Sequence, residues 1–79
     1  MAEEEYKLIY VEGALEDETS WYLKESEAFQ LKYLDDMFMN IVNSPAEHTK
    51  VLCLIDAETR KIIHQNEAST WMNDMLEEL

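Results

Sequence analysis

The sequence contains only one cysteine, one glycine and one proline among its 79 residues. A lone Cys53 excludes an internal disulfide, and the chain has neither the CxxC nor the HxxxH spacing of structural zinc sites. A chain whose only glycine is Gly13 can hardly build the glycine-rich loops that bind phosphates and dinucleotides. No GxSxG or HExxH motif is present either. We therefore expect a protein that is not an enzyme and that has no cofactor and no metal.

Basic residues are also scarce. Six Lys and Arg residues face eighteen Asp and Glu residues, which gives a formal net charge of −12. Nucleic-acid binding relies on Lys and Arg to replace the counterions of the phosphates, so direct binding to nucleic acid is not expected. Anionic membrane surfaces are excluded for the same reason. The charge favours a protein partner with a basic or mixed surface, or competition with nucleic acid for such a partner.

Long apolar runs are absent. No window approaches the roughly 18–20 apolar residues of a membrane span, and the acidic start MAEEEYK does not resemble a secretory signal. A free thiol without a signal is typical of a reducing compartment, so the predicted location is cytoplasmic.

The length predicts one domain, at residues 6–79, preceded by an acidic tail at residues 1–5. A core of this size seldom supplies more than about 3–5 kcal/mol of net stability without a disulfide, a metal or a partner. The hydrophobic fraction of 47% allows an unusually apolar core. A homodimer is the other possibility that the composition leaves open.

The N-terminal half predicts a hairpin. Residues 6–11 are rich in β-branched and aromatic side chains and end at Glu12-Gly13, and residues 19–24 have similar chemistry. In this interpretation Gly13 permits the turn. The alternative is one long helix that begins near Ser20.

A helix is predicted from Ser26, its expected N-cap, to Asn43-Ser44-Pro45, because proline disfavours helical geometry at the residue before it. Apolar residues recur every three or four positions along its core-facing side: Ala28, Leu31, Leu34, Phe38, Ile41 and Val42.

Residues 50–56 and 61–65 predict a second hairpin, with residues 57–60 as its turn. The run VLCLI is apolar on both faces, as in a central strand that is covered on both sides. A second helix, capped by Ser69 or Asn66, is predicted to reach the C-terminus. Its apolar face holds Ala68, Trp71, Met72, Met75, Leu76 and Leu79. The fold prediction is a small α+β domain of order ββαββα, an antiparallel four-stranded sheet with two helices on one face; the alternative is βαββα with one long first helix.

Three groups of residues are candidates for chemistry. The consecutive acids Glu16, Asp17 and Glu18 diverge in direction, so they predict a solvated hairpin loop or a partner contact instead of a calcium site. In a hairpin with residues 57–60 as its turn, Cys53 faces His64, so a thiol–imidazole dyad is geometrically possible. A mid-strand cysteine in an acidic protein lacks the cations that would lower its pKa, so a buried structural thiol is the preferred interpretation. Together with His48, these two residues offer at most three zinc ligands.

The first predicted helix is the preferred partner-binding element. Tyr33, Met37 and Met39 cannot all share the face of its core stripe, and exposed apolar patches usually have partners. The full predicted partner-binding set adds the acids around them and on two other segments: Tyr33, Asp35, Asp36, Met37, Met39, Asn40, Glu16, Asp17, Glu18, Asp74, Glu77 and Glu78.

The leading functional hypothesis is a non-enzymatic intracellular protein-binding module that inhibits or regulates a larger protein. In size and charge alone, the chain resembles the small inhibitor proteins that bacteriophages use against host enzymes and defence systems, and this resemblance rests on no motif. The alternatives are a DNA mimic that competes for a basic site, and a small enzyme or enzyme subunit that uses Cys53 and His64.

Overall fold

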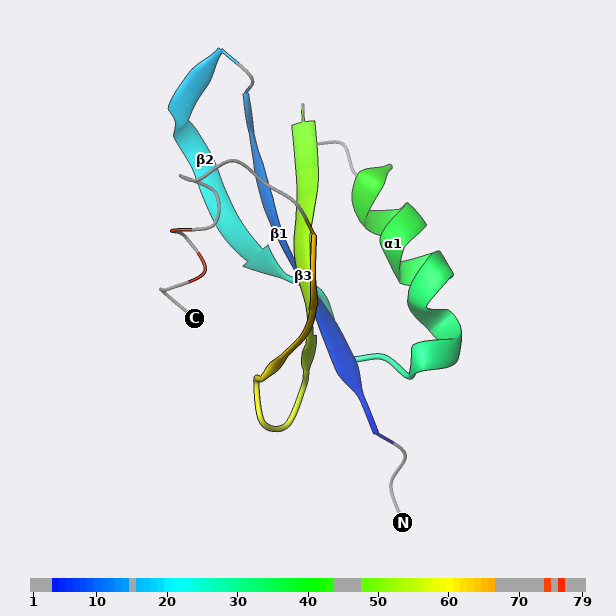
Figure 1. Ribbon diagram of the computed structural model, residues 1–79. Coiled ribbons are helices and arrows are strands. Elements are labelled where there is room, and N and C mark those ends of the chain that lie inside the picture. Colours follow the sequence, from blue (N-terminus) through cyan, green and yellow to red (C-terminus); the bar gives the residue numbers. More distant parts are fainter. Residues whose placement is uncertain (1–3, 15, 44–47, 67–73, 75, 77–79) are drawn as a thin grey trace.

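The computed structural model describes residues 4–14, 16–43, 48–66, 74 and 76 of the chain (Figure 1). Its elements, in chain order, are β1 (Tyr6–Ala14), β2 (Asp17–Glu25), the 3-10 helix η1 (Leu31–Tyr33), α1 (Leu34–Val42), β3 (His48–Asp56) and β4 (Ile62–Gln65).

The four strands form one antiparallel sheet in the order β2-β1-β3-β4, and α1 covers one of its faces (Figure 1). The predicted α+β class and four-stranded antiparallel sheet are therefore confirmed. The alternative with a long first helix is wrong, because residues 17–25 pair with β1 as a strand. Their β-branched and aromatic side chains favour this geometry.

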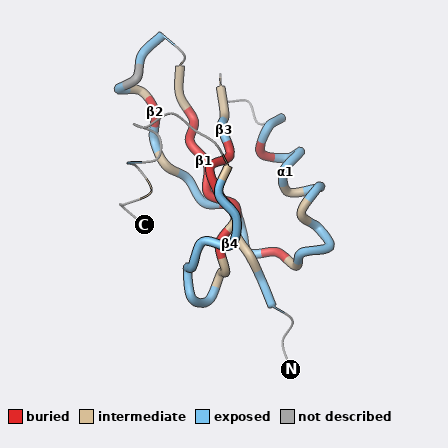
Figure 2. The backbone as a smooth tube through the Cα atoms, viewed as in Figure 1, coloured by how far each residue is buried: buried red, intermediate tan, exposed pale blue. Residues whose placement is uncertain are grey.

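The buried residues are concentrated on the two central strands, β1 and β3 (Figure 2), and they pack on both faces of the sheet. On the α1 face, Leu8, Tyr10 and Val51 pack with Phe29 and with Ile41 of α1. The opposite face holds two further clusters, built from Ile9, Cys53 and Ile55 and from Val11, Trp21 and Leu52. The pairing of β1 with β3 shifts by one residue between Ile9 and Tyr10, which allows the neighbours Leu52 and Cys53 to pack on the same face. The run VLCLI is thus covered on both sides, as predicted.

Gly13 has a different role from the one predicted. It lies inside β1 and has no positive φ, so it does not form the turn. A Cβ at this position would lie 2.7 Å from Cγ and Cδ2 of the Trp21 side chain and 2.8 Å from the Trp21 Cα. The glycine therefore allows the indole ring of Trp21 to cross β1, where Trp21 Nε1 donates a hydrogen bond to the Ala14 carbonyl at 2.9 Å.

The first helix starts later than predicted. Ser26 is buried and is not an N-cap, since its hydroxyl accepts a hydrogen bond from the Leu8 backbone N–H at 2.8 Å. Phe29 exchanges two backbone hydrogen bonds with Tyr6, with N–O distances of 2.7 and 2.9 Å. Segment 26–29 is therefore held extended, because it satisfies backbone groups of β1 beyond the end of β2.

The predicted core stripe of this helix is only partly correct. Ile41 is buried, and Leu34 packs beside it. Leu31 is 52% exposed and Ala28 is exposed too, whereas Phe29, which the stripe omitted, is buried. The helix ends at Val42, with Asn43 as its C-cap, as the sequence predicts.

The second predicted hairpin is confirmed, with β3 and β4 joined by a tight turn. The Asp56 carboxylate accepts hydrogen bonds from the backbone N–H groups of Glu58 and Thr59 at 2.8 and 3.0 Å, and Arg60 takes up a positive φ of 63°. Arg60 then reaches Glu25 at the end of β2, with an N–O distance of 2.7 Å.

The second predicted helix falls almost wholly outside the described residues. Of this segment the structure describes only Asp74, which is helical, and Leu76, which lies in a 3-10 turn. Leu76 packs against the two clusters opposite α1, and not on the α1 face where the sequence placed this segment. None of the helices in the described residues has the length and apolar character needed to cross a membrane.

Candidate functional site

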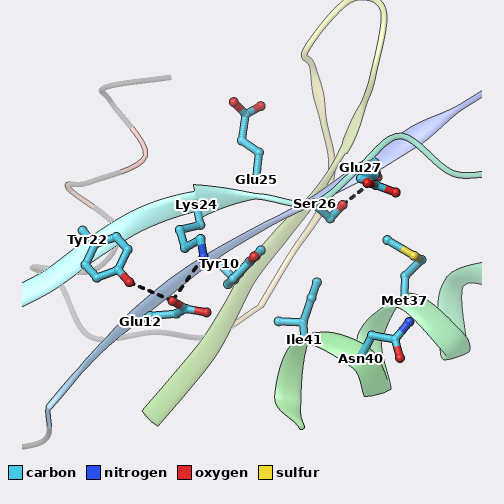
Figure 3. Close-up of a pocket in the computed structure, with 10 residues that line it drawn as sticks. All are labelled: Tyr10, Glu12, Tyr22, Lys24, Glu25, Ser26, Glu27, Met37, Asn40 and Ile41. Carbon is cyan, nitrogen blue, oxygen red and sulfur yellow. Dashed lines mark hydrogen bonds and ion pairs between the residues drawn. The ribbon is translucent and has the colours of Figure 1, made fainter. Parts of the chain in front are cut away.

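A polar cluster lies on the α1 face of the β1–β2 hairpin. The strand register places Tyr10 opposite Lys24 and Glu12 opposite Tyr22, so alternate residues of both strands project toward the same side. Figure 3 shows these four side chains together, with Met37, Asn40 and Ile41 of α1 across from them. The space between is a cavity of about 620 Å³.

Glu12 is the centre of this cluster. Glu12 is only 5% exposed. Its Oε2 accepts a hydrogen bond from the Tyr22 hydroxyl at 2.9 Å and lies 3.4 Å from the Lys24 Nζ. The Lys24 ammonium also lies 6.0 Å from the centre of the Tyr10 ring. A buried carboxylate is tolerated here because it is hydrogen-bonded and paired with a cation.

The electrostatics of the cluster keep Tyr22 and Lys24 protonated near neutral pH. The hydrogen bond to Glu12 raises the pKa of Tyr22 above its ordinary value. Electrostatic interactions with Tyr10, and then with Glu12, raise the pKa of Lys24. A catalytic lysine or tyrosine needs a lowered pKa to act as a base or nucleophile near neutral pH, so both shifts run in the opposite direction.

A second cavity, of about 420 Å³, lies between α1 and the β3–β4 hairpin. Its lining is mainly apolar and includes Leu34, Phe38 and Leu54, with Asp35 and His64 as polar members. Phe38 is 39% exposed, so this groove is open to solvent.

The side of α1 that faces solvent carries Asp35, Asp36, Met39 and Val42, which we call the outer face of α1. Met39 is 53% exposed and lies one helical turn from each aspartate. Neither aspartate forms an ion pair with another described residue. The predicted grouping of exposed apolar and acidic side chains on this helix is therefore present.

Other members of the predicted partner-binding set lie elsewhere. Met37 is half-buried and packs against the core cluster beneath α1. Asn40 is exposed and lines the first cavity, and Tyr33 is 49% exposed, with the Lys32 ammonium 5.3 Å from the centre of its ring. Asp74 is exposed, whereas Glu77 and Glu78 lie outside the described residues.

The acids of the first hairpin are separate from α1. Glu16 and Asp17 are exposed at its turn, and the side chain of Glu18 is outside the described set. The Asp17 carboxylate accepts hydrogen bonds from the hydroxyl and the backbone N–H of Thr19, which lower its pKa. The nine residues of β1 separate this turn from Glu4 and Glu5 by about 30 Å, so the described acids are spread along the molecule.

The Cys53–His64 pairing predicted from a regular hairpin is wrong. The register shifts between Leu54 and Ile55, so Cys53 faces Gln65 and His64 faces Leu54. Burial raises the pKa of the Cys53 thiol to about 11. Among the residues with a described position, no group of three or more His, Cys, Asp or Glu side chains is arranged to hold a metal ion.

Sequence reasoning missed the polar cluster around Glu12. The signal was available in the alternation Tyr10-x-Glu12 and Tyr22-x-Lys24, since residues two apart in a strand share a face. It was hidden because the pairing register of the two strands, which brings the four side chains together, depends on where the turn lies.

Comparison with protein-family models, with curated proteins and with solved structures finds no match to this chain. The geometry of the chain's own surfaces is therefore what bears on its function.

Proposed function

We propose that this protein is a non-enzymatic binding module that regulates a larger protein by occupying a basic or mixed surface on it. The observation that carries the proposal is the outer face of α1, where Met39, 53% exposed, lies beside Asp35 and Asp36. An exposed, adaptable apolar side chain among carboxylates suits a partner surface that offers both an apolar contact and basic side chains.

The overall charge supports the same partner chemistry. With a formal net charge of −12, the protein attracts basic surfaces and accelerates encounter with them. The apolar contact then contributes affinity that salt does not screen.

The test is capture of a partner from a lysate of the native cells, followed by affinity measurements with matched variants. Met39→Lys and the double variant Asp35→Asn/Asp36→Asn should each weaken binding by about tenfold or more, which corresponds to about 1.4 kcal/mol. The control is Glu4→Gln/Glu58→Gln, which removes the same charge from exposed positions outside α1. All four acidic positions are exposed, so the variants should keep the wild-type circular dichroism spectrum.

Salt separates the two contributions. Raising the ionic strength from about 20 mM to about 300 mM should weaken binding by the wild type more than binding by the double variant. The proposal is refuted if a captured partner binds the Met39 and aspartate variants as tightly as the wild type, or if the control variant loses as much affinity as they do.

A further inference from the structure

The groove between α1 and the β3–β4 hairpin, which we call the hairpin groove, borders the core directly. Leu8 and Val51 form part of its lining and are only 3% and 5% exposed. Phe38 lines it from α1 and is partly open to solvent. The volume of about 420 Å³ lies within the range of roughly 300–1,000 Å³ that is typical of ligand sites. An apolar group that enters this groove therefore contacts core residues that are already in place.

The described part of the chain leaves this groove to another molecule. Leu76, near the C-terminus, packs against the clusters on the opposite face of the sheet and so lies away from the groove. A second copy of the chain is disfavoured as the occupant, because two molecules with a formal charge of −12 repel each other.

Asp35 selects the charge of the occupant. Among the described residues that line the groove, it is the only one with a formal charge when histidine is counted as neutral. Its carboxylate forms no ion pair with any other described residue. A cation bound beside Asp35 would gain a partner, whereas an anion would be repelled both by Asp35 and by the net charge of the protein. The groove therefore favours a molecule that carries a cation close to an apolar group.

We propose that the hairpin groove receives an apolar side chain from a basic segment of the partner, while a lysine or arginine beside that side chain pairs with Asp35. This inference rests on the proposed function and adds the chemistry by which the partner is recognised. Asp35 belongs both to the outer face of α1 and to the groove, so one partner segment can contact both surfaces. An aromatic side chain suits the groove best, because it can also pack against the ring of Phe38.

Short peptides test the groove without the partner. The probe is the acetylated and amidated peptide Gly-Lys-Phe-Lys-Gly, added at up to about 5 mM to the isotope-labelled full-length protein and followed by the NMR shifts of backbone amides. Saturable shifts are expected at Val51 and Leu54, with a Kd of about 1 mM. A peptide with alanine in place of phenylalanine, and one with glutamate in place of both lysines, should each bind at least about tenfold more weakly.

Each variant of the groove has its neighbour in the chain as a control. Asp35→Asn should weaken peptide binding by about fivefold, whereas Asp36→Asn removes the same charge outside the groove and should change it by less than about twofold. His64→Lys places a cation in the groove, where it competes with the peptide for Asp35, so a loss of at least about tenfold is expected. Ile63→Lys adds the same charge at the adjacent residue, which does not line the groove, and should have little effect. All four positions are exposed, so the variants should keep the wild-type circular dichroism spectrum.

Several results would overturn the proposal. One is the absence of any shift at about 5 mM peptide, and another is equal binding of the phenylalanine and alanine peptides. Tighter binding of the glutamate peptide would assign the groove to an acidic partner. Shifts of the same amides that grow with protein concentration alone would identify a second copy as the occupant. Equal losses in Asp35→Asn and Asp36→Asn, or in His64→Lys and Ile63→Lys, would show that the peptide binds outside the groove.

The captured partner separates this inference from the proposed function. His64→Lys should weaken its binding by about tenfold or more, and Ile63→Lys should not. A partner that responds to Met39→Lys but not to His64→Lys refutes the role of the groove and leaves the proposed function intact. A partner that responds to His64→Lys but not to Met39→Lys supports the groove and refutes the outer face of α1 as the binding surface.

Discussion

Substituting Gly13 tests the close approach of Trp21 to β1. In Gly13→Ala the new methyl group would lie 2.7 Å from the Trp21 ring and 2.8 Å from the Trp21 Cα, which is too close for both to stay in place. Trp21 is 9% exposed and packs with Val11 and Leu52, so its ring has little room to move. Overpacking of this kind costs about 1–3 kcal/mol, and loss of the bond from Trp21 Nε1 to Ala14 costs about 1 kcal/mol more.

An opposing effect reduces this cost. Gly13 has no positive φ, so alanine can adopt its backbone conformation. Because alanine makes the unfolded chain less flexible than glycine does, the substitution also stabilises the folded state by about 0.4–1 kcal/mol. The expected net loss is about 1–3.6 kcal/mol in the free energy of unfolding. For a domain of this size, each kcal/mol lowers Tm by about 4–8 °C, so a fall of roughly 4–29 °C is expected.

The assay is thermal and urea unfolding followed by far-ultraviolet circular dichroism, run as a double-mutant cycle with Trp21→Ala. Trp21→Ala alone should cost about 3–5 kcal/mol, so all four proteins are compared in the same concentration of a stabilising osmolyte. Without the indole ring, the penalty of Gly13→Ala should fall by about half or more, with the remainder due to the Trp21 backbone. An unchanged penalty in the Trp21→Ala background, or a Gly13→Ala variant more stable than the wild type, would refute the clash with the ring.

Two further predictions concern titratable groups. With a pKa of about 11, the Cys53 thiol is ionised in about one molecule in 4,000 at pH 7.4, whereas an unperturbed thiol is ionised in about one in 14. Because the thiolate is the reactive form, iodoacetamide should label native protein at least about 100-fold more slowly than urea-unfolded protein. Comparable native and unfolded rates, followed by intact mass, would show that the thiol is neither buried nor suppressed. Backbone hydrogen bonds from Thr59 and Glu58 lower the pKa of Asp56 in the folded state. The carboxylate therefore stabilises the fold at pH values above its unfolded-state pKa, and this stabilisation is lost as the pH falls through its folded-state pKa. Asp56→Ala should therefore have a lower Tm than the wild type at pH 7, with a gap that narrows at pH 3; Glu58→Ala is the exposed control, and an Asp56 gap that does not change with pH would contradict the reasoning.

The local elements that the sequence predicted best are those with repeated, consistent signals. Both hairpins are present because β-branched and aromatic runs flank polar turns, and α1 ends at Val42 as the approach to Pro45 predicts. The start of that helix was misplaced because Ser26 is a good N-cap by type. The chain instead uses its hydroxyl to satisfy the backbone of Leu8, a contact over eighteen residues that no local pattern contains.

The sequence predicted some features of the candidate site and could not predict others, for the same reason. The sequence correctly indicated that α1 exposes an apolar side chain beside Asp35 and Asp36, because helical spacing alone separates Met39 from the core stripe. It could not assign Met37 to the core, since that depends on how the helix is rotated against the sheet. It could not exclude the Cys53–His64 pair either, because a single-residue shift within β3–β4 decides which residues face each other.

By itself, the sequence determined the class of this protein: a small, strongly acidic α+β chain with two hairpins and a helix, and with too few cysteines and glycines for the common cofactor motifs. These properties follow from composition and from periodicity along the chain. Only the tertiary structure decided that Gly13 makes room for Trp21 and that Glu12 gathers Tyr22 and Lys24. Each of these depends on strand register and on which strands are neighbours, and both are set by contacts between residues far apart in the chain.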